Sequence, residues 1–131
     1  MELRESAEDY LEKILMLNRS MGRVRSVDLA NGMNFSKPSV SIALKKLRQN
    51  GYVTIDGSGS ITLTESGLEI ATRVLERHTL LSSLLMALGV EEAIAKEDAC
   101  RIEHDLSTQS FEKIKEYCQK HAIGQQEDAG C

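Results

Sequence analysis

Three residues in the last third of the chain, Cys100, Glu103 and His104, place a thiol, a carboxylate and an imidazole close together. If this segment is helical, the spacing i, i+3 and i+4 brings all three side chains to one face. Sulfur, oxygen and nitrogen donors in one cluster are typical ligands of transition-metal ions. The sequence therefore predicts a metal site on this helix.

Further donors lie far away in the sequence. Asp9 and Glu12 are one turn apart on a predicted N-terminal helix, and His78 falls on the apolar stripe of a long helix. Each has an ordinary alternative: His78 as a core histidine bonded to a carbonyl, and the Asp9/Glu12 and Glu103/His104 pairs as solvated faces. The site exists only if the three helices converge.

Apolar periodicity and capping residues predict the elements that would position these donors. Ser6 with Asp9 resembles a capping box for the first helix, Ser26 is the expected cap of the second, and Pro38 falls in the first turn of the third. The expected helices cover 8–17, 26–32, 37–50, 64 to near 89, 91–105 and 107–120, and two strands, 52–55 and 60–63, flank a Gly-rich turn.

This order of elements predicts a mainly α fold: an N-terminal winged helix-turn-helix with a two-stranded β wing, followed by a helical dimerisation domain. The expected domains are a DNA-binding domain over 1–75 and a metal-binding and dimerisation domain over 76–123, with a disordered tail over 124–131. No internal repeat is apparent.

Composition excludes several other classes. The 131 residues are 41% hydrophobic and 27% charged, typical of a globular chain, and no apolar run approaches the ~20 residues of a membrane helix. The charged N-terminus lacks the features of a secretory signal, so a cytoplasmic protein is expected. Three cysteines, Cys100, Cys118 and Cys131, are an odd number without regular spacing, which predicts reduced thiols.

Charge is unevenly distributed along the chain, although the formal net charge is only -4. Acidic residues collect in the first helix and after residue 90, whereas the segment from Arg19 to Asn50 has Asp28 as its only acid. This distribution predicts a cationic DNA-reading face and a separate anionic site. The basic residues of that segment are Arg19, Arg23, Arg25, Lys37, Lys45, Lys46 and Arg48.

The third predicted helix is the candidate recognition helix. Its lysines and Arg48 would bond backbone phosphates, and the polar residues at its entrance would lie nearest the bases. For any single residue, helix capping or simple solvation is an equal alternative. The expected DNA-binding residues are Arg25, Ser36, Lys37, Pro38, Ser39, Ser41, Lys45, Lys46 and Arg48.

Three segments together resemble the metal-dependent repressor family that includes the diphtheria toxin repressor and the manganese transport regulator. They are Ser-Ala-Glu-Asp-Tyr-Leu-Glu-Lys-Ile over 6–14, the pair Arg77-His78, and Cys-Arg-Ile-Glu-His-Asp-Leu-Ser over 100–107. The resemblance implies a homodimer that represses metal-uptake genes when metal is plentiful. It also implies the ligands Asp9, Glu12, His78, Cys100, Glu103 and His104.

The ligand set combines two branches of that family. Asp9 and Glu12 resemble the manganese type, whereas Cys100 resembles the iron type. Ser82 and Lys96 stand where the iron type has ancillary-site ligands, so an ancillary site of that kind is not expected, and a second ion of the manganese type is compatible with Asp9, Glu12 and His78. No SH3-like third domain is expected.

Thiolate ligation favours Fe(II), Zn(II) or Co(II) over Mn(II). We therefore expect Fe(II) first and Mn(II) next, with Zn(II) or Co(II) as in vitro alternatives.

The expected mechanism is a linkage in which metal joins the first helix to the fourth and fifth helices. That joining would set the separation of two recognition helices to the ~34 Å that a palindromic operator on double-stranded DNA requires.

No membrane and no small organic substrate are expected as partners. No catalytic residues are expected, because no nucleophile and base motif or phosphate-binding loop is present. The alternatives are a winged-helix regulator of a non-metal signal, a small metalloenzyme and a structural interaction domain.

Overall fold

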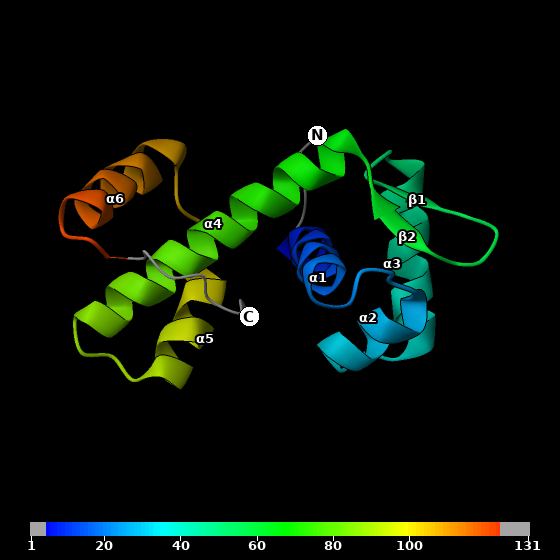
Figure 1. The fold of residues 1–131 in the computed structure, drawn as a ribbon, viewed down its shortest axis with the longest axis horizontal. Helices are drawn as coiled ribbons and strands as arrows, with labels where there is room; N and C mark the ends of the chain where they lie inside the picture. The colour runs from blue at the N-terminus through cyan, green and yellow to red at the C-terminus, as the bar shows by residue number, and fades with distance from the viewer. Residues whose placement is uncertain (1–4, 124–131) are drawn as a thin grey trace. The chain divides into compact units, whose positions relative to one another are not determined.

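The computed structural model describes residues 5–123. The mainly α prediction with a two-stranded sheet is confirmed (Figure 1). The expected tail over 124–131, including Cys131, lies outside the described residues. None of the described helices is long and apolar enough to cross a membrane. The elements are α1 (Glu5–Met21), α2 (Ser26–Met33), α3 (Lys37–Gln49), β1 (Val53–Ile55), β2 (Ile61–Leu63), α4 (Glu65–Ala87), α5 (Glu92–Ile102) and α6 (Thr108–Lys120).

The chain divides into two compact units, and the division falls within α4, between Arg73 and Val74. In the N-terminal unit α1 contacts α2, α3 and β2, and α2 packs against α3. Leu11 and Ile14 of α1, Leu29 of α2 and Val40 of α3 are fully buried. Each such aliphatic side chain contributes roughly 1.5–3 kcal/mol through burial. This apolar core fixes the direction in which α3 presents its solvent-facing side.

The helix starts follow local hydrogen-bonding chemistry. Ser36 is the N-cap of α3, and its hydroxyl accepts a bond from the amide of Ser39. The expected cap of α2 at Ser26 is wrong: Arg25 is the N-cap, because its amide donates to the Asp28 carboxylate at 2.9 Å. Ser6 is likewise not a cap, since α1 already includes Glu5. The segment between α2 and α3 can turn sharply because Asn34 adopts a left-handed conformation (φ 58°).

The β1–β2 hairpin forms the wing, and its loop extends away from the helices (Figure 1). Its antiparallel register pairs Val53 with Leu63 and Ile55 with Ile61, within one residue of the expected strand bounds. Val24 adds a bridge, because its carbonyl accepts from the amide of Ile61 at 2.7 Å. No sequence pattern predicts this bridge, which connects the segment before α2 to the wing.

The tip of the wing is organised around Asp56. Its carboxylate accepts bonds from the Ser58 amide and hydroxyl at 2.9 and 2.7 Å, and from the Ser60 amide at 2.9 Å. These bonds, led by the one from the Ser58 hydroxyl, hold the pKa of Asp56 below its ordinary value of 3.8. Arg23 donates to the Ser58 hydroxyl. The tip is therefore a hydrogen-bonded turn with a cation beside it.

The start of α4 requires a glycine. Thr64 precedes the helix, and its hydroxyl accepts from the Gly67 amide at 3.2 Å and donates to the Gly51 carbonyl at 2.7 Å. A Cβ on Gly67 would overlap the carbonyl oxygen of Tyr52. The backbone of α4 thus approaches the backbone of Tyr52 where the helix leaves the wing, which only a glycine permits.

The C-terminal unit contains the rest of α4 together with α5 and α6. Its core is formed by buried apolar residues of all three helices: Val74, Leu75 and Leu81 of α4, Ala95 and Ala99 of α5, and Phe111 and Cys118 of α6. The predicted helix over 91–105 is too long, because α5 ends at Ile102. The residues that follow α5 form a turn that leads into α6.

Candidate metal centre

His78 is the innermost donor of the C-terminal unit. The residue is fully buried on α4, and its Nδ1 atom lies 3.1 Å from Oε2 of Glu103. The Sγ atom of Cys100, on α5, lies 3.8 Å from the same nitrogen. The prediction left open a core histidine bonded to a carbonyl. The structure instead surrounds Nδ1 with a carboxylate and a sulfur, both groups that bind transition metals.

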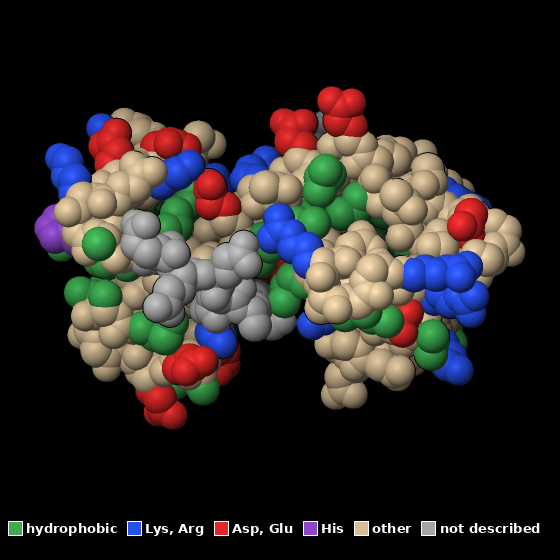
Figure 2. All heavy atoms as spheres, viewed as in Figure 1, with side chains coloured by type: hydrophobic (Ala, Val, Ile, Leu, Met, Phe, Trp, Pro, Cys, Tyr) green, Lys and Arg blue, Asp and Glu red, His purple; other side chains and the backbone are tan. Residues whose placement is uncertain are grey.

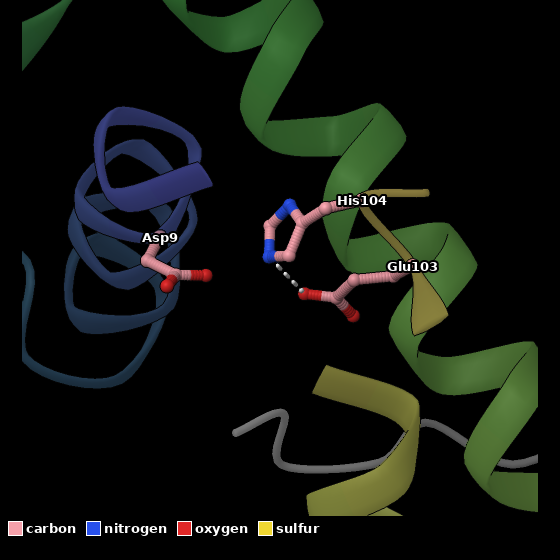
Figure 3. A group of neighbouring side chains, drawn as sticks. All are labelled: Asp9, Glu103 and His104. Atoms are coloured by element: carbon pink, nitrogen blue, oxygen red, sulfur yellow. Dashed lines mark ion pairs between the residues drawn. The ribbon is translucent and has the colours of Figure 1, made fainter. Parts of the chain in front are cut away.

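Glu103 lies between two imidazoles. One carboxylate oxygen faces His78, and the other, Oε1, lies 3.4 Å from Nε2 of His104 (Figure 3). The side chain of Glu103 is fully buried, and that of His104 is only 4% exposed. The alternative that Glu103 and His104 form a solvated face is therefore wrong. Cys100 lies on α5, and Glu103 is the C-cap of that helix, with helical backbone angles and an amide that donates to the Ala99 carbonyl at 3.0 Å. His104 follows the end of α5.

Arg77 fixes the turn that carries Glu103. Its Nη1 atom donates to the carbonyl oxygen of Glu103 at 3.1 Å and to that of Leu106 at 2.7 Å. Its guanidinium also lies over the ring of Phe111, 5.2 Å from the centroid. One buried side chain thus connects α4, the turn after α5, and α6. In the sequence Arg77 is only the neighbour of His78, and no spacing rule reveals this role.

Two of the three cysteines, Cys100 and Cys118, lie among the described residues. Cys118 is a buried free thiol whose pKa is raised by burial. The expectation of a reduced thiol at Cys100 stays a prediction, because Cys131 lies outside the described residues. A thiolate ligand at Cys100 requires the reduced form.

The two positions that differ from the iron branch are occupied by side chains with local partners. Ser82 is buried on α4, and its hydroxyl donates to the Thr79 carbonyl at 3.1 Å. Lys96 on α5 forms an ion pair with Glu92 at 3.0 Å. A hydroxyl bonded to the backbone and an ammonium group are poor replacements for a carboxylate and an imidazole as metal ligands.

Asp9 and Glu12 belong to the N-terminal unit. Both lie on α1, one turn apart; Glu12 is buried and Asp9, also labelled in Figure 3, is partly exposed. Next to them Glu8 forms an ion pair with Arg73 at 2.9 Å. Their role as ligands remains a prediction.

The donor set of the C-terminal unit fits a divalent transition metal. It offers imidazole nitrogen from His78 and His104, carboxylate oxygen from Glu103 and, when reduced, thiolate sulfur from Cys100. Buried carboxylates are stable when they are paired or coordinate a cation. The buried carboxylate of Glu103 lies between the imidazole nitrogens of His78 and His104. This cluster is therefore the candidate metal centre.

The predicted DNA-binding residues are all exposed on the N-terminal unit. Figure 2 shows Lys and Arg side chains gathered over the side of this unit that carries α3 and the wing. Ser36 and Ser39 are joined to each other by a hydroxyl bond of 2.9 Å and so serve the helix start. We call the exposed N-cap arginine of α2 and the exposed basic residues of α3 the cationic face: Arg25, Lys37, Lys45, Lys46 and Arg48.

Comparison with known proteins matches both parts of the chain. Residues 2–60 match the iron-dependent repressor N-terminal DNA-binding domain, and residues 64–123 match the iron-dependent repressor metal-binding and dimerisation domain. The chain is 36% identical over 120 residues to an uncharacterised HTH-type transcriptional regulator of Methanocaldococcus jannaschii, covering 90% of this chain and 96% of that one. It is 35% identical over 118 residues to the transcriptional regulator MntR of Escherichia coli, covering 90% and 76%.

A solved structure is also similar. A manganese-dependent transcriptional repressor in complex with manganese matches with a TM-score of 0.78 and 30% identity over 86% of this chain. The match covers 52% of that chain, so the present chain spans about half its length.

Proposed function

Because this chain belongs to the iron-dependent repressor family of transcriptional regulators, whose members are metal-dependent DNA-binding repressors and not enzymes, we propose that it represses iron or manganese homeostasis genes. The observation that carries the proposal is the buried cluster of His78, Cys100, Glu103 and His104. A chain with such a donor cluster in one unit and a cationic winged helix in the other is suited to a metal-dependent DNA switch.

His78, Glu103 and His104 would bind the metal through their side-chain nitrogen and oxygen atoms. Arg77 positions Glu103 by a hydrogen bond to its backbone carbonyl. When bound, a divalent cation supplies the positive charge that these donors share. We propose that Asp9 and Glu12 complete the ligand set, on the grounds of their spacing and the resemblance of segment 6–14 to the family motif. Under this proposal α1, which packs against α3, transmits occupancy of the site to the DNA-reading helix.

The proposed metal is Fe(II) ahead of Mn(II). A thiolate from Cys100 is a softer ligand than the carboxylates, and sulfur donors favour Fe(II), Zn(II) and Co(II) over Mn(II). Selectivity in a cell also depends on geometry and on which ion is available. Replacing the thiol with a carboxylate, Cys100→Asp, is expected to shift the preference towards Mn(II). Metal titrations of both proteins under reducing, anaerobic conditions test this, and an unchanged order of affinities would contradict it.

The proposed partner is a palindromic operator bound by a homodimer. Two recognition helices contact successive major-groove segments on one side of DNA when they are about 34 Å apart. The lysines and arginines of the cationic face would bond phosphates, which makes the affinity fall as salt is raised. This binding requires no contact to a membrane or a small organic molecule.

The test is DNA-binding anisotropy at fixed salt with Fe(II), Mn(II), Zn(II), Co(II) or chelator, under reductant. Tight binding with at least one ion and none with chelator is expected. Glu103→Gln, which removes a proposed ligand, should weaken metal binding by more than the roughly 10- to 100-fold that loss of an outer-shell partner costs. Asp105→Asn, which changes an exposed carboxylate on the same turn, serves as the matched control. Equal DNA binding with metal and with chelator would refute the metal switch.

A further inference from the structure

The outer face of α3 carries one large apolar side chain. Val40, Leu44 and Leu47 are buried, whereas Ile42 is 59% exposed. At 3.6 residues per turn, two positions correspond to about 200° around the helix. Ile42 follows Val40 and precedes Leu44 by two positions each, so it points almost directly away from the core.

Three of the four helical neighbours of Ile42 on that face are polar or cationic, and the fourth is a proline. Positions i-4, i-3, i+3 and i+4 are Pro38, Ser39, Lys45 and Lys46, all of them exposed. A surface that binds another protein through apolar contact would group several apolar side chains, which this face does not. One branched apolar side chain among phosphate-binding groups instead suits a partner that is polyanionic and carries an isolated apolar group.

Double-stranded DNA has such a group in its major groove. The C5-methyl of thymine is the one apolar feature among the hydrogen-bonding edges of the bases, and apolar side chains contact it. Ser36 and Ser39 bond each other at the helix start, which reduces their freedom to read base edges. Ile42 stands at the centre of the face that remains.

We propose that Ile42 reads a thymine methyl group in each operator half-site and so contributes to sequence specificity. This inference rests on the proposed DNA-binding function. It predicts that a single methyl group on the DNA accounts for much of what the Ile42 side chain contributes to affinity.

The experiment removes the methyl group from either partner. The operator is a duplex enriched from a random library with metal-loaded wild-type protein, and each thymine is replaced in turn by deoxyuridine, which lacks only the methyl. Wild-type affinity should fall about fourfold per half-site at one position, the effect of losing about one buried methyl. Ile42→Ala should bind the thymine operator more weakly by at least as much, and should lose nothing further when that position carries deoxyuridine.

The matched control is Met21→Ala, which truncates another half-exposed apolar side chain of the same unit but lies outside α3. It should show the wild-type response to deoxyuridine. Thermal unfolding of Ile42→Ala should match wild type, because an exposed side chain contributes little to the core. The inference fails if no deoxyuridine position weakens wild-type binding, or if Ile42→Ala keeps the full deoxyuridine effect. Failure of the metal-loaded protein to enrich any duplex would overturn both this inference and the proposed function.

Discussion

Arg77 offers a direct test of how the metal centre is held together. Its side chain is 9% exposed, and one guanidinium nitrogen donates to two carbonyl oxygens, those of Glu103 and Leu106. Hydrogen bonds from a charged donor contribute roughly 1.5–3 kcal/mol each, and the contact over the ring of Phe111 adds roughly 0.5–2 kcal/mol. Because such contributions are not fully additive, Arg77→Ala should lower the free energy of unfolding by about 3–5 kcal/mol.

A lysine at this position separates charge from shape. Arg77→Lys keeps the positive charge but replaces the flat guanidinium fork with a compact ammonium group, which does not bond both carbonyls while lying over the ring. We expect a loss of about 1.5–3 kcal/mol, the value of one such bond. Arg101→Ala is the control, because Arg101 is 70% exposed and its pairs with Glu97 and Asp98 contribute little, within about 0.5 kcal/mol.

Urea unfolding of the metal-free proteins, followed by circular dichroism at fixed protein concentration, measures these differences. Metal titration calorimetry supplies a second readout, because a loosened turn should weaken metal binding about 10- to 100-fold, as for other residues that orient ligands. An Arg77→Ala protein as stable as Arg101→Ala would show that the two carbonyl bonds do not hold the turn. Unchanged metal affinity in Arg77→Lys would refute its positioning role.

Three further outcomes follow from single sites. Gly67→Ala should destabilise the protein by about 1–3 kcal/mol or more in thermal unfolding, because its Cβ would overlap a backbone carbonyl, whereas Gly57→Ala, in open space, should not; equal melting temperatures would contradict this. Since the hydrogen bonds led by that of Ser58 lower the pKa of Asp56, its contribution to stability is full above its ordinary value of 3.8 and is lost as pH falls through the lower folded-state pKa. A carboxylate titration by NMR with an ordinary midpoint would refute that bonding. Burial raises the pKa of the Cys118 thiol, so a thiol reagent at pH 8 should label it slowly until urea unfolds the chain; labelling at the rate of free glutathione would contradict its burial.

Local chemistry predicted the order of elements well. The hairpin strands are within one residue of their expected bounds, because alternating apolar residues flank a Gly-rich turn at 56–59. Pro38 in the first turn of α3 and Ser36 before it are local signals that the structure follows. Arg25 was missed as a cap because residue type favours serine at that position, while the deciding bond comes from the carboxylate of Asp28.

The donors of the metal centre were predicted by type, but their arrangement was not. The sequence predicts a thiol, a carboxylate and two imidazoles as donors, and the resemblance to known motifs implies that they belong to one site. It does not indicate that Glu103 lies between His78 and His104, since those contacts depend on how the turn after α5 packs against α4.

The end of α5 explains why the predicted helix over 91–105 is too long. In a helix continued through residue 107, the Glu103 carbonyl would accept from the amide of Ser107. Here that carbonyl accepts from Arg77, which lies 26 positions earlier in the chain, and Ser107 caps α6 instead. The periodic pattern is compatible with either arrangement, because no residue between 102 and 106 is a helix breaker. The competing donor, Arg77, takes the Glu103 carbonyl where α5 ends, next to the carboxylate that lies buried between two histidines.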